Sequence, residues 1–211
     1  MVNINKGKVT PKSGSDENLE ASTGPTVEWR KRRDEAIRNY HELGLCPIPL
    51  RGKAPYQKNW TDPAKYQGVD VEEVLRMFAP NDNVGLLAGI PLKDGQYLRI
   101  IDYDDSELWD QHIEQADKGK GYAWLEQGGI VRTGSGGKHH YVLSDAPEKF
   151  VFQGHNGNEH GGEAQGSGSQ CVAPPSIHPD TKEEYQWLYE NWDHLPLVSD
   201  QELQRSYTPV Q

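Results

Sequence analysis

The clearest hydrophobic pattern in the chain runs from Tyr97 to Asp104, where apolar residues lead directly into acidic ones. Side chains alternate across a β-strand, so one face of a strand here carries Leu98, Ile100, Asp102 and Asp104. At ~4 Å and an effective dielectric of ~20, two carboxylates repel by roughly 4 kcal/mol, so a buried strand end needs a cation or a proton to hold both. Oxygen ligands at positions i and i+2 suit Mg²⁺ or Mn²⁺. The alternative is a strand that stops at a polar loop, where Asp105 or Ser106 caps the next helix.

Helical spacing occurs in four other places. A helix is predicted from Pro25 to Gly44, with its apolar residues near a period of 3.6. The basic quartet Arg30-Lys31-Arg32-Arg33 then lies on a solvated face. Further helices are predicted from Asp70 to Pro80, from Ser106 to the Gly119–Gly121 region and, weakly, from Ser199 to about Ser206.

Short apolar runs predict strands between these helices. Leu45 to Leu50 contains two prolines, which confine it to a sheet edge or a strand end. Val84 to Ala88 is expected beside the Asp102 strand, and Ile130 to Leu143 forms a hairpin. Two more strands follow, from Gln170 and over Tyr185–Tyr189. Helices that alternate with short strands indicate an α/β or α+β fold.

The hairpin carries candidate chemistry. Its Gly-Ser-Gly-Gly turn allows backbone N–H groups to approach a phosphate closely. His139 and Tyr141 are expected on one face and His140 on the other. The glycine-rich stretch from Gln153 to Gly168 is predicted to be a mobile loop, and its two histidines, His155 and His160, make only a weak zinc pattern.

Composition limits the protein class. The chain has 211 residues, 34% hydrophobic, with a net charge of −10 and a mean hydropathy of −0.85, which is typical of a soluble, cytoplasmic protein without a membrane span. Cys46 and Cys171 are expected to be small buried hydrophobes rather than a disulfide. The acidic balance argues against tight, nonspecific coating of duplex DNA, although local basic clusters permit a positive groove.

Composition and apolar periodicity together predict the domain organisation. Residues 1–24 have almost no apolar periodicity and are expected to be a disordered leader. Residues 25–192 form the folded domain, and residues 193–211 are expected to be a C-terminal tail or the start of a linker.

Three motifs stand in order: the strand ending at Asp102 and Asp104, the run from Thr133 to Tyr141, and the run from Glu163 to His178 that contains Ala-Pro-Pro-Ser-Ile-His-Pro. Together they resemble the prim-pol domain of the archaeo-eukaryotic primase superfamily, over about residues 28 to 190. The resemblance implies an α+β fold, in which a catalytic sheet like that of RNA-recognition domains packs with a second small α/β unit.

The resemblance also implies site residues. Asp102, Asp104 and Glu163 would hold two divalent ions, Mg²⁺ or Mn²⁺, for nucleotidyl transfer. Nucleotide-binding positions would be Ser135, Gly136, Gly137, His139, Ser176, His178 and Lys53. Gln165 departs from the family, which usually has a basic residue there. Glu159 competes with Glu163 for the third acidic position, but it lies four residues too early and is expected to be a solvated loop carboxylate.

The implied activity is that of a DNA primase and polymerase in plasmid, phage or virus replication. Its partners would be single-stranded DNA template, primer and NTP or dNTP, with a helicase fused or associated, and no membrane. Two other functions stay open. A rolling-circle nicking enzyme would use metal-binding histidines and a tyrosine nucleophile, but adjacent His139 and His140 point apart. A non-catalytic template-binding module would keep the fold without catalysis.

Overall fold

The computed structural model describes residues 25–119, 122–157 and 160–210. The predicted leader, residues 1–24, and the competing carboxylate Glu159 lie outside these ranges.

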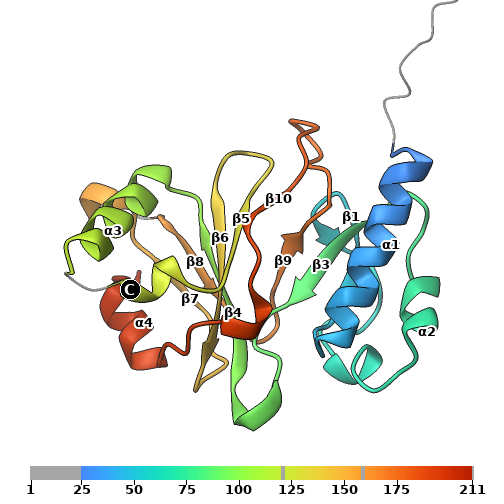
Figure 1. Cartoon of the computed structure of the whole chain (residues 1–211), viewed down its shortest axis with the longest axis horizontal. Coiled ribbons are helices and arrows are strands. Elements are labelled where there is room, and N and C mark those ends of the chain that lie inside the picture. The colour runs from blue at the N-terminus through green and yellow to red at the C-terminus, as the bar shows by residue number, and fades with distance from the viewer. Residues whose placement is uncertain (1–24, 120–121, 158–159, 211) are drawn as a thin grey trace, which may run out of the picture.

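Two antiparallel sheets form the centre of the protein (Figure 1). The smaller has the order β2 (Ala54–Pro55), β1 (Pro47–Arg51), β3 (Asn83–Leu87) and β9 (Gln170–Ala173). The larger has the order β10 (Gln186–Tyr189), β5 (Gly129–Arg132), β6 (Lys138–Ser144), β4 (Tyr97–Tyr103), β8 (Gly162–Gln165) and β7 (Phe150–Phe152). The α+β class is confirmed. One pairing was predicted wrongly: β3 lies in the smaller sheet between β1 and β9, and does not pair with β4.

Helices cover both ends of this arrangement. In Figure 1, α1 (Val27–Glu42) and α2 (Val71–Arg76) lie beside the smaller sheet, and α3 (Ser106–Asp117) and α4 (Asp200–Ser206) beside the larger one. Each begins at a side-chain cap, which is Thr26, Asp70, Asp105 or Ser199. The described connections also contain short 3₁₀ turns at Pro63–Lys65, Lys93–Gly95, Ala123–Glu126, His155–Gly157 and Trp192–His194.

Alternation along β4 separates two hydrophobic cores. Leu98 and Ile100 join the core that contains Ile37 of α1 and Leu86 of β3, so this face of the larger sheet packs toward the smaller sheet. The opposite face carries Ile101 and Tyr103 into a second core with Leu108, Trp109 and Leu203 from α3 and α4. Any group on the Leu98 face of β4 therefore lies between the two sheets.

Arg33 shows where the predicted solvated face of α1 was wrong. Its side chain is only 5% exposed and donates hydrogen bonds to the carbonyls of Ala79 and Asp82. Its guanidinium also lies 5.7 Å from the centre of the Phe78 ring. A charged group is tolerated there because carbonyls of the turn after α2 and the carboxylate of Asp34 satisfy its donors.

Two segments that were predicted to be irregular contribute, through their described residues, to the sheets and cores. The glycine-rich stretch from Gln153 to Gly168 contains β8, which pairs with both β4 and β7. Residues predicted to be a C-terminal tail place Val198, Leu203 and Tyr207 in the second core. These described residues are placed by contacts with distant parts of the chain, which local composition does not report.

The prolines of β1 occupy an open edge, as their chemistry requires. Pro47 and Pro49 pair with β3 on one side, whereas β2 pairs only with Leu50 and Arg51 on the other. Within the described ranges, none of the helices combines the length and the apolar character that a bilayer span requires.

Candidate active site

The site is centred on the pairing of β4 with its two neighbours. Asp102 lies opposite His139 of β6 on one side and opposite Glu163 of β8 on the other. Residues paired in this way point to the same face of a sheet, with Cβ atoms about 4.5–5.5 Å apart. The register therefore places two carboxylates and an imidazole in a row on the face that looks toward the smaller sheet.

His139 is the most enclosed of the three. Its Nε2 lies 3.4 Å from Asp102 Oδ1, its side chain is 5% exposed, and that of Asp102 is 27% exposed. Nδ1 of His139 has no hydrogen-bond partner among the described residues. The ring therefore retains hydrogen-bonding capacity toward a bound molecule.

Asp104 lies one residue beyond the end of β4. Its backbone N–H donates to the carbonyl of Gly161, and its carboxylate lies 2.8 Å from His160 Nε2. The side chain is 58% exposed. Asp104 thus points into solvent at the mouth of the site, where it is held by a histidine from the neighbouring loop.

Glu163 is supported from its own strand. Gln165 Nε2 donates to Glu163 Oε2 at 2.6 Å. At the position where the resemblance implies a basic residue, this chain therefore has a neutral amide that orients the carboxylate without neutralising it.

Cys171 enters the site from the smaller sheet. Its thiol, the Asp102 carboxylate and a ring nitrogen of His139 all lie within 4.8 Å of one another. Burial, and after it the charges of Asp102, Glu163 and Asp104, raise the pKa of this thiol. Of the three carboxylates, Asp102 is the one whose oxygen lies within 4.8 Å of the sulfur. The cysteine is free and buried as predicted, but its position in the site was missed, because only the packing of one sheet on the other reveals it.

His178 and Tyr185 extend the site away from the carboxylates. The rings of His139 and His178 both lie against Tyr185, with centroids 5.9 and 6.2 Å from it. Nδ1 of His178 accepts the backbone N–H groups of Asp180 and Thr181, so the neutral ring carries its proton on Nε2, which has no partner in the described residues. Burial, with a contribution from the charge of Lys53, lowers the pKa of His178. Tyr185 was not predicted as a site residue.

The glycine turn between β5 and β6 packs on the His178 loop. A Cβ atom on Gly134 would lie 2.3 Å from His178 Cβ, and Thr181 Oγ1 donates to the Gly134 carbonyl. Ser135 and Gly136 are exposed, and Gly137 is half-buried, close to the Tyr103 carbonyl. Only a glycine at position 134 permits this approach, so the turn and the histidine form one surface.

Lys53 and Ser176 have different environments. Lys53 is exposed in the turn between β1 and β2, and its charge reaches His178. The Ser176 hydroxyl is fully buried, where it accepts the N–H of Val84 and donates to the carbonyl of the same residue. That geometry joins the end of β9 to β3 and leaves no free hydroxyl for a ligand.

His140 and Tyr141 occupy enclosed positions away from Asp102 and Glu163. His140 Nε2 donates to the Gln127 carbonyl at 2.7 Å and its ring stacks on Trp124, on the opposite face of β6 from His139. Tyr141 shares the His139 face but is fully buried against Trp187, and burial raises its pKa. Neither a paired-histidine metal centre nor an accessible tyrosine nucleophile is formed here.

The two loop histidines bind separate carboxylates. His155 donates its backbone N–H to Asp105 and places Nδ1 2.6 Å from the same side chain, whereas His160 contacts Asp104. The hydrogen bond to Asp105 raises the pKa of His155. They hold the loop against the start of α3, and they do not form a zinc pair with each other.

The three carboxylates Asp102, Asp104 and Glu163, called the carboxylate row below, have the chemistry of a cation site. In the ranges that the structure describes, no Lys or Arg forms an ion pair with Asp102, Asp104 or Glu163. Carboxylate oxygens without a fixed cationic partner fit a divalent ion, and the free ring nitrogens nearby fit phosphate oxygens.

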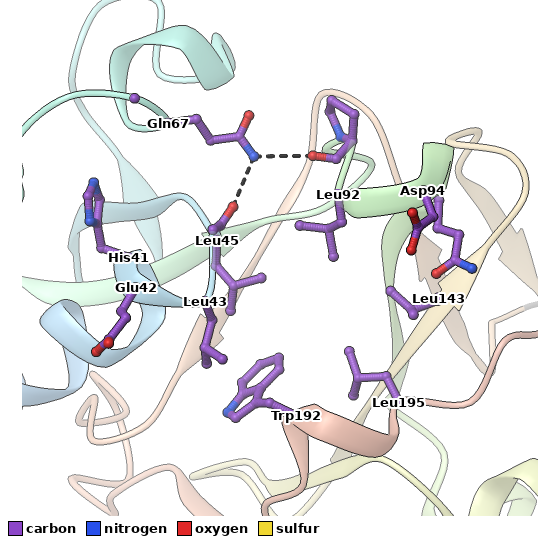
Figure 2. A pocket seen from close by; sticks show the side chains of 14 residues that line it. His41, Glu42, Leu43, Leu45, Gln67, Leu92, Asp94, Leu143, Trp192 and Leu195 are labelled. Atoms are coloured by element: carbon purple, nitrogen blue, oxygen red, sulfur yellow. Dashed lines mark hydrogen bonds between the residues drawn. The ribbon is translucent and has the colours of Figure 1, made fainter.

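A separate cavity of about 670 Å³ is lined by the end of α1, by the turn before β4 and by the segment around Trp192 (Figure 2). Figure 2 shows Leu43, Leu45, Leu92, Leu143 and Leu195 around it, with Trp192 below. It borders the segment before β4 begins, whereas Asp102 lies near the end of that strand. The candidate active-site residues therefore do not line this cavity.

Fold and site together define an α+β protein with a carboxylate and histidine centre between two antiparallel sheets. The chain belongs to the family of bifunctional DNA primase/polymerase N-terminal domains, whose family model matches residues 36–200. Among curated proteins, none matches the chain.

Proposed function

We propose that the protein is a DNA-dependent primase and polymerase that synthesises primers on single-stranded DNA and extends them with NTP or dNTP. One observation carries the proposal: the register of β4 with β6 and β8, which places Asp102 beside both Glu163 and His139. Membership of the primase/polymerase family supports the same activity.

In this proposal Asp102, Asp104 and Glu163 hold two divalent ions, Mg²⁺ or Mn²⁺. When bound, such ions supply Lewis-acid activation of a 3′-hydroxyl and charge neutralisation for the leaving pyrophosphate. The protein itself contributes mainly position, because nucleotidyl transfer needs reactants aligned in a charged site. Asp102 is suited to this role since it lies in a strand paired on both sides.

His139 and His178 serve the triphosphate. Each has a buried ring nitrogen without a partner in the described residues, and both rings contact Tyr185. The backbone N–H groups of Ser135 and Gly137 and the charge of Lys53 complete the phosphate contacts, whereas the N–H of Gly136 donates to the Thr133 carbonyl within the turn. The buried hydroxyl of Ser176 is left out of this set, because Val84 uses it.

The template is single-stranded DNA, and the primer pairs with part of it. A helicase, fused or separate, would supply the template in replication. A cytoplasmic location fits this role.

The test is nucleotide incorporation. The protein is incubated with single-stranded DNA, Mg²⁺ or Mn²⁺ and labelled nucleotides, with and without primer. Asp102→Ala and Asp104→Ala should each lower the incorporation rate at least ~10²-fold. The apo fold should persist, because each change removes one of several repelling charges. Asp110→Ala, an exposed acidic position on α3, is the matched control.

The outcomes separate the alternatives. Near-normal extension by the Asp102 variant would refute the proposal. A covalent tyrosyl–DNA adduct would indicate nicking instead, and DNA binding without incorporation by the wild-type chain would indicate a template-binding module.

A further inference from the structure

Three side chains from three strands meet where the sheets face each other. Asp102 comes from β4, His139 from β6 and Cys171 from β9, and one carboxylate oxygen, one ring nitrogen and the thiol lie within 4.8 Å of one another. His139 is 4% exposed and Cys171 is 3% exposed. A buried ring nitrogen without a partner is costly, and His139 Nδ1 is one within the described residues.

We propose that these three side chains form a thiolate-containing site for a zinc-class cation, which shares Asp102 with the carboxylate row. Thiolate and imidazole select Zn²⁺ or Co²⁺, whereas Mg²⁺ prefers oxygen ligands alone. Carboxylate oxygen, imidazole nitrogen and thiolate sulfur are all zinc ligands, and three protein ligands with the fourth position open to water match the pattern of an open zinc site. The thiol releases its proton to solvent when the ion binds.

The site has two consequences. A cation held there occupies Asp102 and His139 at once, so Zn²⁺ competes with both the divalent ions and the nucleotide of the proposed reaction. It also links β4 and β6 of the larger sheet to β9 of the smaller sheet, so binding should raise the free energy of unfolding with the logarithm of free Zn²⁺ once the site is saturated.

The experiment measures metal binding directly. The full chain is titrated with Co²⁺, followed by its thiolate-to-cobalt charge-transfer absorption, and then with Zn²⁺ in competition, all in excess Mg²⁺. Cys171→Ser should lose the charge-transfer band and bind Zn²⁺ at least ~10–100-fold more weakly. Removing a group that merely hydrogen-bonds a metal ligand already lowers metal affinity by about this factor. Cys46→Ser is the matched control, because Cys46 is the other buried free cysteine and lies outside the three-residue group.

His139→Ala provides a second variant that keeps the thiol, and it should also weaken Zn²⁺ binding. Wild-type protein that binds Co²⁺ without a thiolate band would overturn the proposal, as would equal Zn²⁺ affinity in wild type and Cys171→Ser. Both readouts are independent of nucleotide incorporation, so this inference and the proposed function can fail separately.

Discussion

Consecutive histidines with opposite surroundings give the sharpest prediction at the scale of the residue. His139 lies beside Asp102 with a free ring nitrogen, whereas His140 is fixed under Trp124. His139→Ala should lower nucleotide affinity roughly 10- to 100-fold, since a hydrogen bond to a charged group contributes about 1.5–3 kcal/mol. Titrating nucleotide at fixed primer measures this. His140→Ala should lower the free energy of unfolding and leave the nucleotide affinity of the folded protein unaltered. If His140→Ala lowered nucleotide affinity and His139→Ala did not, the phosphate contact would belong to His140.

Glu163 gives a second prediction at this scale. Glu163→Gln keeps the size and a carbonyl oxygen that can still accept from Gln165, so the fold should persist. Removing the charge should weaken Mn²⁺ binding and lower incorporation at least ~10²-fold. Metal titration and primer extension measure the two effects. Glu159→Gln, a change of the same kind outside the described residues, should be nearly silent, and a defect there instead would move the third acidic position to Glu159.

Side-chain alternation was enough to predict that Asp102 shares a face with Ile100 and that His139 and His140 diverge. The position of Cys171 was not predictable in this way, because it depends on how β9 packs across from β4. Arg33 was misassigned for a related reason: the carbonyls that satisfy it belong to residues 79–82, far away in sequence.

At the scale of the element, the contact between the β5–β6 turn and the His178 loop gives a third prediction. In Gly134→Ala the new methyl group would collide with His178 Cβ and the Glu183 carbonyl. The two loops should separate, with about 1–3 kcal/mol lost from stability and an increased KM for nucleotide. Urea unfolding and nucleotide titration measure these changes.

Gly44→Ala is the control for backbone strain alone. Gly44 has a φ of +78°, with open space around its position, and it lies at the end of α1. The Gly44→Ala change should lower the free energy of unfolding by about 1 kcal/mol and leave KM for nucleotide unchanged. If Gly134→Ala also left KM unchanged, the turn would not be part of the nucleotide surface.

Helices and hairpins were the elements that local sequence predicted best, since caps and periodicity lie within each segment. Asp70, Asp105 and Ser199 cap the helices that were expected to begin near them. Strand β8 was not predicted as an extended element over its full length, because Gly161 and Gly162 suggest a loop. A Cβ on Gly162 would lie 2.0 Å from the Asp102 carbonyl, so the glycine is required by the neighbouring strand.

At the scale of the whole molecule, buried neutral histidines predict sensitivity to acid. Burial lowers the pKa of His140 to about 4, against 6.5 in the unfolded chain, and does the same for His112. Between these values the unfolded state binds more protons, so the free energy of unfolding should fall as the pH drops from about 6.5 to about 4. One such group contributes at most about 1.4 kcal/mol per pH unit in this window.

Urea unfolding at several pH values between 4 and 7.5 measures the slope. His140→Phe keeps a ring against Trp124 and should reduce the slope, even if it lowers stability at every pH by losing the bond to Gln127. His194→Phe, at an exposed position, should leave the slope unchanged. An unaltered slope in the His140 variant would assign the acid sensitivity to other groups.

The division into two sheets was beyond local sequence patterns. Strands β3 and β9 enclose the long segment that builds most of the larger sheet, so their pairing joins residues about 90 positions apart. Residues 193–211 were expected to be a tail or the start of a linker, yet Val198, Leu203 and Tyr207 lie in the second core, where Tyr207 contacts Tyr103. Such long-range contacts have no signature in a window of ten or fifteen residues.

Strand β4 lies inside the larger sheet and is hydrogen-bonded along both edges over Ile100–Tyr103. Amide hydrogens in such a strand exchange with solvent only through large openings, whereas exposed loop residues such as His160 can detach through small ones. The two carboxylates should therefore differ in how firmly they are held, because Asp102 lies in a strand paired along both edges and Asp104 lies beyond its end with a side chain that is 58% exposed.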